Sequence, residues 1–269
     1  MTDARAYAAA GLPARLERPG ILAFLLWVAA LALVVTSFKG VGFSASEFVK
    51  GLPQMARFAS GLFPPSLERI EPVLWSLLET FQMAIAGTVI GVLLSVPFAI
   101  LSAQRLSPHP VVQWATRALV SLFRTVPDLI WAVFFVVTVG LGPFAGTLAL
   151  IVDTVGFCGR FFAEAMEEAD RGPQEALSAL GARKGAIIAA AVLPAALPSM
   201  ITTSLFSLEK ATRSSVVLGL VGAGGIGMEL EVALTFFNYQ EAATIILCIF
   251  VLVLIVEQAS ALLRQRIIA

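Results

Sequence analysis

Charged side chains stand inside long apolar segments of this sequence, and their types and spacing are the first guide to its chemistry. If such a segment crosses a membrane, a charge near its centre costs about 2.5–3.5 kcal/mol on insertion scales. Such a charge is therefore expected to have an ion-pair partner or a functional role. Glu209 and Arg213 are four residues apart, which predicts an ion pair on one helical face. The same spacing relates Arg124 and Asp128, provided that Pro127 leaves that turn intact. The charges of this kind are Glu79, Arg124, Asp128, Asp153, Arg160, Glu209, Lys210 and Arg213, with Glu257 near a segment end.

Two interpretations of these charges stay open. They can be structural ion pairs inside a helical bundle, or some of them can line a path for a solute. Arg124, Lys210 and Arg213 would suit an anionic solute, because their field lowers the electrostatic barrier to its passage.

Catalysis is a third use of buried charge, and the sequence argues against it. Asp128 and Asp153 could form a carboxylate pair, but neither lies in a motif of membrane proteolysis, and the chain contains no HExxH or GxSxG. The sole histidine, His109, lies beside prolines in a loop. We therefore predict no catalytic residue and no metal site.

Composition places the chain in a membrane. Of its 269 residues 58% are hydrophobic and only 13% are charged, with a mean hydropathy of +0.90, so a water-soluble domain could not cover its apolar surface. The net charge is zero, with 18 residues of each sign, which gives no basic field for nucleic acid. Cys158 and Cys248 lie in apolar runs without CxxC spacing, and we interpret them as small buried hydrophobic residues.

The apolar segments predict an all-α membrane protein with six spanning helices. The first, Ile21 to Phe38, contains no charge and would be about 27 Å long as a helix. A secretory signal is the alternative for this segment, but its apolar core is long and no clear cleavage site follows. Pro127 predicts a break in the third helix. The predicted spans are 21–38, 72–103, 111–140, 144–167, 195–218 and 233–263.

Charge bias predicts the orientation of these spans, with both termini in the cytoplasm. An amphipathic stretch within residues 39–70 predicts an interfacial helix on the outer surface. We divide the chain into a cytoplasmic segment (1–20), a first helix with the outer amphipathic segment (21–70), and a main transmembrane domain (71–269) with a loop at 171–194. The basic residues predicted inside are Arg5, Arg15, Arg18, Arg105, Arg171, Arg183, Lys184, Arg264 and Arg266, against Lys39, Lys50, Arg57 and Arg69 outside.

The stretch Gly172 to Pro194, GPQEALSALGARKGAIIAAAVLP, is predicted to lie on the inner surface. A short amphipathic helix from Pro173 to Leu180 should end where Gly181 allows a left-handed exit. Glu175 would place negative charge near the positive N-terminal end of this helix. Its apolar side would consist of Ala176, Leu177 and Leu180.

This stretch resembles the coupling loop of permease subunits from binding-protein-dependent ABC importers, which reads EAA, three residues, Gly, nine residues, Ile-x-Leu-Pro. Glu175, Ala176, Gly181, Leu193 and Pro194 match that pattern, whereas Leu177 replaces the second Ala and Ala191 replaces the Ile. The resemblance implies the six-helix type I permease fold with a cytoplasmic coupling helix. Without it, periodicity alone would equally allow a helix that merely joins two spans.

A glycine-rich segment follows the fifth predicted span. It satisfies the dinucleotide-binding pattern G-x-G-x-x-G, but span-length apolar segments flank it and no alternating strands and helices surround it, so we reject that interpretation. The glycines can simply turn the chain, or their backbone can line the outer mouth of a translocation path. They are Gly222, Gly224, Gly225 and Gly227.

The resemblance is strongest to the phosphonate branch of these permeases and covers about residues 72–265. It rests on Arg124–Asp128, Gly140–Gly146, the coupling loop and Arg213–Gly219. It implies a homodimer in the lipid of the bacterial inner membrane, two cytoplasmic ATPase subunits, an extracytoplasmic binding protein, and phosphonates, phosphite or phosphate as cargo. Methionine permeases share much of the pattern and are the alternative.

The chain contains no G-x-x-x-x-G-K-[ST] phosphate loop. We therefore expect no cofactor in this subunit, with ATP and Mg bound by a partner ATPase whose closure rocks the spans between two openings. A secondary transporter would also hold charges in the membrane, but it would not need the coupling loop.

Overall fold

The structure is a computed structural model that describes residues 20–42 and 44–268. The chain divides into two compact units, Met1–Ala59 and Ser60–Ala269, and each is treated by itself. The predicted cytoplasmic segment at 1–20, with Arg5, Arg15 and Arg18, lies outside the described residues except for Gly20.

Two helices follow in the first unit. α2 spans Ile21–Gly40 and is apolar on every side, which confirms the predicted first helix to within two residues. α3 spans Ala45–Gly61 and extends just past the boundary between the units. It is amphipathic, as predicted, but its place on an outer membrane surface stays a prediction.

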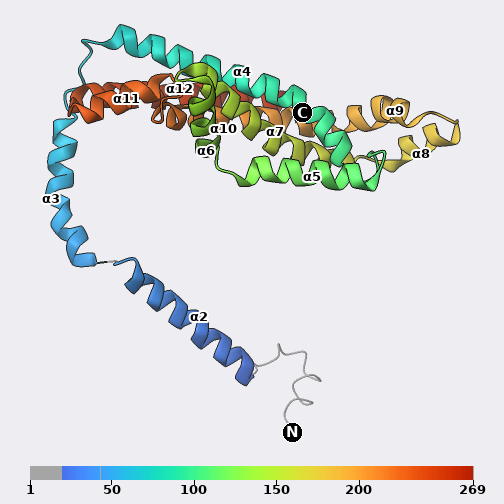
Figure 1. The fold of residues 1–269 in the computed structure, drawn as a ribbon, viewed down its shortest axis with the longest axis horizontal. Coiled ribbons are helices and arrows are strands. Elements are labelled where there is room, and N and C mark those ends of the chain that lie inside the picture. The colour runs from blue at the N-terminus through green and yellow to red at the C-terminus, as the bar shows by residue number, and fades with distance from the viewer. Residues whose placement is uncertain (1–19, 43, 269) are drawn as a thin grey trace. The chain divides into compact units, whose positions relative to one another are not determined.

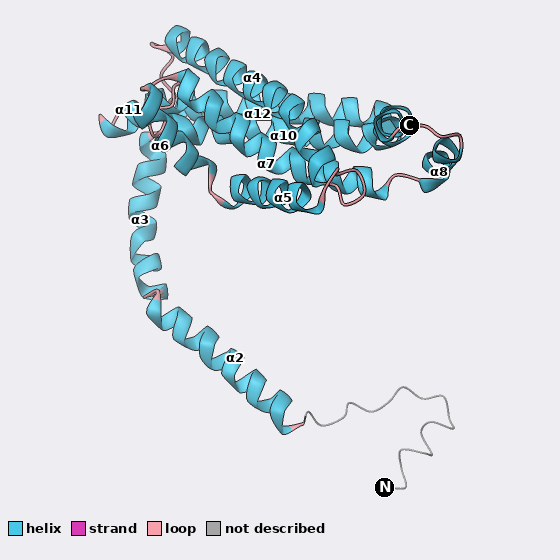
Figure 2. Cartoon of the chain, turned by 45° about the vertical axis from the view of Figure 1, so that its right-hand side comes forward, coloured by secondary structure: helices cyan, strands magenta, loops and turns pink. Residues whose placement is uncertain are grey.

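The second unit is a bundle of long helices with short connections (Figure 1). Figure 2 shows only helices and loops in the described part of the chain. The elements are α4 (Ile70–Ser102), α5 (Pro110–Thr125), α6 (Asp128–Val139), α7 (Pro143–Glu168), α8 (Arg171–Ala179), α9 (Lys184–Ile187), the π-helix η1 (Ile188–Val192), α10 (Leu193–Gly219), α11 (Ile226–Thr235) and α12 (Tyr239–Ile268).

α7 is the central helix, and it packs against α4, α5, α6 and α10. Small residues let these helices approach closely, as is common between membrane helices. A Cβ on Gly87 would lie 2.6 Å from the Leu150 Cβ, and one on Gly156 would lie 2.8 Å from the Arg124 backbone nitrogen. Phe162 and Leu150 are fully buried along the same helix. Close helix contact therefore fixes where α5 and α10 place their charges.

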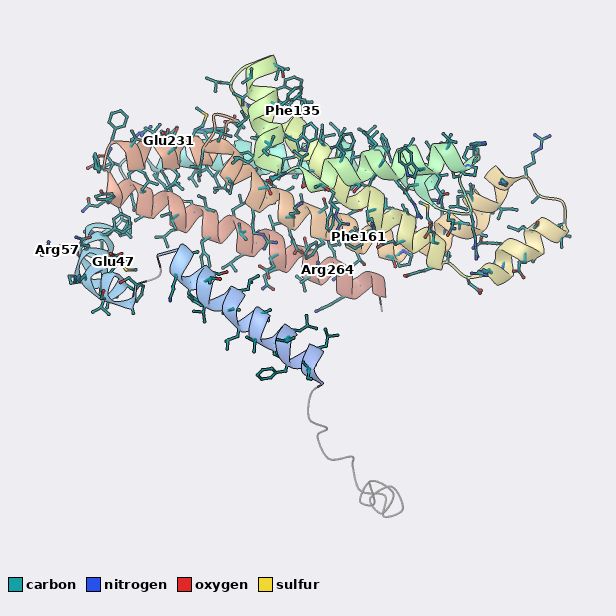
Figure 3. All side chains as sticks on the ribbon, turned by 60° about the horizontal axis from the view of Figure 1, so that its bottom comes forward. Glu47, Arg57, Phe135, Phe161, Glu231 and Arg264 are labelled. Atoms are coloured by element: carbon teal, nitrogen blue, oxygen red, sulfur yellow. The ribbon has the colours of Figure 1, made fainter. Side chains whose placement is uncertain are left out.

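Five helices of the described chain are long and apolar enough to cross a membrane, and α5 with α6 makes a sixth if that pair is one span. The predicted break at Pro127 is confirmed, because α5 ends at Thr125, α6 begins at Asp128, and the two axes differ by 91°. In Figure 3, Phe135 marks α6 where it stands away from the direction of the neighbouring helices.

The predicted start of the sixth span, at residue 233, was wrong. Ala233 belongs to the short helix α11, and α12 begins at Tyr239. Phe237 interrupts the helix because its φ is +59°, and the Asn238 N–H donates to the Ala233 carbonyl at 2.8 Å. Such a left-handed residue closes a helix by satisfying its last carbonyl groups.

The fifth span also begins earlier than predicted. α9, η1 and α10 form one continuous helix over residues 184–219, and η1 is a single π-helical segment within it. π-Helical turns contain an extra residue and are uncommon.

Candidate functional site

The helix α8 is presented at one end of the bundle, which also contains the last turns of α4 and α7 and which we call the coupling end (Figure 1). An Asp170 carboxylate oxygen caps it by accepting a hydrogen bond from the Gly172 N–H at 3.1 Å. The chain leaves the helix through Gly181, whose φ of +80° confirms the predicted left-handed exit. No residue of α8 is buried, and Leu180 is 84% exposed.

One predicted feature of α8 was wrong. The helix starts at Arg171, two residues before the predicted Pro173, because Asp170 supplies the cap. Glu175 consequently lies in the second turn, and the first turn contains no acid. Since the field of a helix terminus fades within one turn, Glu175 contributes little by that route. Glu175 and Ala176 are exposed and Leu177 is half-buried, so this surface is accessible to a partner.

A cavity of about 300 Å³ lies between α8, the loop after α4, and the segment formed by α9 and the start of η1. Glu175 is the one acid in its lining, and it faces three basic residues. Sequence reasoning did not connect Arg105 with this place, because Arg105 belongs to the distant loop after α4. The lining is Arg105, Leu106, Arg171, Gln174, Glu175, Ser178, Lys184, Ile187 and Ile188.

The charges of α10 pair with other helices. Arg264 Nη2 of α12 lies 2.9 Å from Glu209 Oε1, so the predicted Glu209–Arg213 pair is wrong. Lys210 Nζ lies 2.7 Å from Asp153 Oδ1 of α7 and 5.4 Å from the ring centroid of Phe157. Helix spacing allowed the local pair, but Glu209 is only 7% exposed and its side chain meets α12 instead. The structural interpretation therefore applies to Glu209 and Lys210.

Arg264 was predicted to lie in a basic inner terminus. Its side chain is 23% exposed and turned into the bundle toward Glu209, and the side of the membrane on which this end lies stays a prediction. Figure 3 shows Arg264 on the half of the bundle nearer α8, away from Glu231.

The remaining predicted path charges have no ion pair within residues 20–42 and 44–268. Arg124 and Asp128 do not share a helical face, because the break at Pro127 turns the chain between them. Asp128 accepts instead from the Leu129 N–H at 2.9 Å. Arg213 is exposed, and Glu79 is half-buried. These four residues stay predictions as path residues.

A second cavity, of about 280 Å³, lies between α5, α7 and the end of α4. Arg124 lines it together with residues that sequence reasoning did not single out for a site, such as Arg117 and Glu167. No local spacing links these helices, and only the positions of Arg117 and Arg124, seven apart on α5, could have signalled a shared face. The lining is Ser102, Arg117, Val120, Ser121, Arg124, Thr125, Arg160, Ala163, Glu164 and Glu167.

The glycine loop, Gly222 to Gly227, turns the chain between α10 and α11 and packs tightly. Gly222, Gly224 and Gly225 have φ of +86°, +84° and +73°, which favours glycine. The Ile226 N–H donates to Thr80 Oγ1 at 2.7 Å. Ile226 is fully buried, so the loop has a structural role. That it lines a translocation path stays a prediction.

The start of α4 is fixed near the same loop, at the end of the bundle that we call the glycine-loop end. Arg69 Nη1 lies 2.6 Å from Glu241 Oε1, and Arg69 Nη2 lies 3.3 Å from Glu229 Oε2. One guanidinium therefore joins the starts of α4 and α12 to α11.

Comparison with known families explains this combination of an exposed surface helix, a broken span and a glycine turn. The family described as binding-protein-dependent transport system inner membrane component matches residues 95–269, well over half of the chain. The chain belongs to this family. It is thus a permease subunit of an ABC importer and a multi-pass protein of the inner membrane.

Two relatives have names that specify a cargo. The chain is 40% identical over 222 residues to the phosphite transport system permease protein PtxC of Stutzerimonas stutzeri, covering 82% of this chain and 81% of that protein. It is 38% identical over 208 residues to the phosphate-import permease protein PhnE of Mycolicibacterium smegmatis, covering 77% of this chain but only 39% of that protein.

A solved structure supports the predicted type I permease fold. The permease is similar to a chain of the MetNI methionine ABC transporter in an inward-facing conformation, with a TM-score of 0.63 and 25% identity. The match covers 73% of this chain and 98% of that chain. The predicted all-helical importer fold is therefore confirmed.

Proposed function

We propose that this permease forms the translocation path for phosphonates, phosphite or phosphate in an ATP-driven importer. The observation that carries the proposal is the helix α8, which buries no residue and presents exposed Glu175, followed by exposed Leu180, at the coupling end. A partner ATPase with ATP and Mg would dock there and supply the energy, and its closure would move α8. A secondary transporter would not need this surface.

The relatives support the choice of cargo. The phosphite permease is 40% identical to this chain, whereas the probable D-methionine transport system permease MetI of Vibrio cholerae is 30% identical over 198 residues. Methionine is therefore the weaker alternative, although the MetNI fold is shared.

The importer is proposed to contain a homodimer of this permease, two ATPase subunits and an extracytoplasmic binding protein, with both permease termini in the cytoplasm. Arg213 is exposed in a spanning helix and has no ion pair within the described residues, which supports a second copy of the chain at that surface, because lipid would not solvate the charge. Labelling of Glu175→Cys in sealed cells checks the orientation, since reagents confined to the outside should not reach it.

Cargo can be identified in reconstituted vesicles that contain the permease, its ATPase and its binding protein. Phosphonate, phosphite, phosphate and methionine are added singly, and ATP hydrolysis is measured. We expect stimulation by one or more of the phosphorus compounds. Stimulation by methionine alone would contradict the proposed cargo, and transport driven by an ion gradient without ATP would contradict the importer.

Docking of the ATPase can be tested by charge reversal on α8. Glu175→Lys should uncouple ATP hydrolysis from transport, because it turns the single acid of its cavity into a fourth base. Glu71→Lys, an exposed acid in the first turn of α4, is the matched control and should leave coupling intact. Unchanged coupling in Glu175→Lys would remove α8 from the proposed interface.

A further inference from the structure

The cavity between α5, α7 and the end of α4 contains an excess of positive charge. Three arginines and two glutamates line it. Both acids are already engaged: Glu164 Oε1 accepts from Arg160 Nε at 2.6 Å, and Glu167 Oε1 accepts from Arg117 Nη2 at 2.6 Å. The uncompensated charge is that of Arg124.

Arg124 has neither an ion pair nor a side-chain hydrogen bond in the described part of the chain. It lies in the last turn of α5, where the negative end of the helix favours a cation. That effect is only a fraction of the cost of a charge in a spanning segment, and α5 itself contains no acid. The structure therefore leaves Arg124 without a counterion.

The surroundings of Arg124 match the needs of an oxyanion. Arg160 of α7 lines the same cavity and uses its Nε for Glu164, which leaves other guanidinium N–H groups to donate. Ser121 adds a hydroxyl group, whereas the Thr125 hydroxyl already donates to the Ser121 carbonyl at 2.7 Å. At roughly 30 Å³ per water, about 280 Å³ holds a small oxyanion and several waters.

We propose that this cavity is a binding site for a tetrahedral oxyanion at the coupling end of the permease. Arg124 and Arg160 are its cations, Ser121 supplies a hydroxyl group, and Glu164 is the internal anion that competes for Arg160. Arg117 stays attached to the Ser102 carbonyl at 2.8 Å and to Glu167, so it fixes one wall. If the proposed function holds, departing cargo would occupy this site last.

Binding can be measured by titrating inorganic phosphate into the purified full-length permease, without ATP or binding protein. Arg124→Gln should weaken phosphate binding about tenfold or more, since a charge-assisted contact of this kind commonly has that effect. Arg124→Lys should retain part of the affinity. Arg266→Gln, which changes an exposed arginine of α12 outside both cavities, is the control and should bind phosphate as the unchanged protein does.

A second variant predicts tighter binding and so does not depend on damage to the fold. Glu164→Gln removes the competing anion and frees Arg160, so phosphate should bind several-fold more tightly. Glu168→Gln is its control, because Glu168 is exposed and outside the lining. Absence of phosphate binding, equal affinity in Arg124→Gln and Arg266→Gln, or no gain in Glu164→Gln over Glu168→Gln would each overturn the site.

Two further titrations distinguish a lipid headgroup from a soluble anion as the source of the oxyanion. Displacement of phosphate by phosphatidylglycerol would support the site and assign it to a lipid headgroup, whereas displacement by phosphite or methylphosphonate, but not by lipid, would assign it to a soluble anion. These titrations do not depend on the proposed cargo. If phosphate binds but no phosphorus compound stimulates the assembled importer, the cargo proposal fails while the site stands.

Discussion

The two ends of the bundle differ in how far the chain satisfies its own groups. At the glycine-loop end, Ile226 is fully buried, its N–H is bonded to Thr80, and Arg69 is shared by two acids. At the coupling end, α8 buries nothing, a cavity with three basic residues adjoins it, and a second cavity between α4, α5 and α7 contains Arg124 without an ion pair in the described residues. The glycine-loop end also has a cavity, of about 440 Å³ and lined in part by Glu68, Phe237 and Glu241, but the guanidinium of Arg69 at that end is paired within the chain. The coupling end is thus the less self-satisfied of the two, and we propose that a partner and an anion complete it.

This difference suggests a division of labour. A membrane gate that is moved by another protein needs one rigid region and one region whose surface stays available. Between the two ends, the ion pairs of Glu209 and Lys210 tie α10 to α12 and α7. Substitutions in the middle of the bundle and at its two ends test this difference. The loss of stability that they cause should be largest in the middle and smallest at the coupling end.

The largest loss of stability is expected from Arg264→Met. It leaves Glu209 buried without a counterion, and breaking a buried pair in this way costs about 3–5 kcal/mol. The free energy of unfolding is measured by detergent titration in mixed micelles. Arg213→Met is the control, and it should cost less than about 1 kcal/mol. Equal losses of stability in the two variants would instead support the Glu209–Arg213 pair that the sequence predicted.

Gly227→Ala should cost about 1–3 kcal/mol at the glycine-loop end. The new methyl group would meet the Val216 carbonyl oxygen and would lie 2.8 Å from the Gly219 Cα, which is too close for a packed helix pair. Gly185→Ala at the coupling end meets open space, and it should be neutral or slightly stabilising. Thermal unfolding of the two variants tests whether the ends differ in packing.

Arg69→Met should cost about 1 kcal/mol, because the guanidinium is 49% exposed and pairs of this kind contribute little in water. The effect should shrink in high salt. Arg171→Met, at the start of α8, removes a charge that has no ion pair within the described part of the chain, so it should change stability less. A larger loss of stability in Arg171→Met than in Arg69→Met would show that charged side chains stabilise the coupling end, which would contradict the proposed difference between the two ends.

Leu180→Ser should have the smallest effect on stability, within about 0.5 kcal/mol, since the side chain is 84% exposed. Its effect on ATP-driven uptake should nevertheless be large, because the apolar side chain is available to the proposed ATPase. Unfolding and uptake are compared in the same preparation. A loss of stability with normal uptake would contradict the assignment of α8 as an incomplete surface.

Two backbone features of the fold were predicted from local sequence signals. Pro127 predicted a break because proline removes a backbone donor, and Gly181 predicted the exit from α8 because glycine tolerates a positive φ. The 91° angle at Pro127 was not predictable, because packing against α7 and α10 sets the direction of α6. Backbone signals of proline and glycine at these two positions were thus reliable.

Contacts between distant helices could not be predicted in this way. The spacing of Glu209 and Arg213 allowed a pair, but it carried no information about Arg264 on α12. The second cavity likewise combines α4, α5 and α7, whose relative rotation depends on close contacts such as Gly156 against α5. Asp170 was missed as the cap because Pro173 was taken as the helix start.

The π-helical segment Ile188–Val192 joins the coupling end to the long helix α10. One surplus residue in that turn offsets the two helical stretches by about 100° of rotation. Deleting a single residue there would rotate α8 and α9 about the axis of α10 by that angle while leaving the residues of α10 unchanged. The direction in which α8 faces thus depends on one residue of η1, independently of how the long helices of the bundle pack.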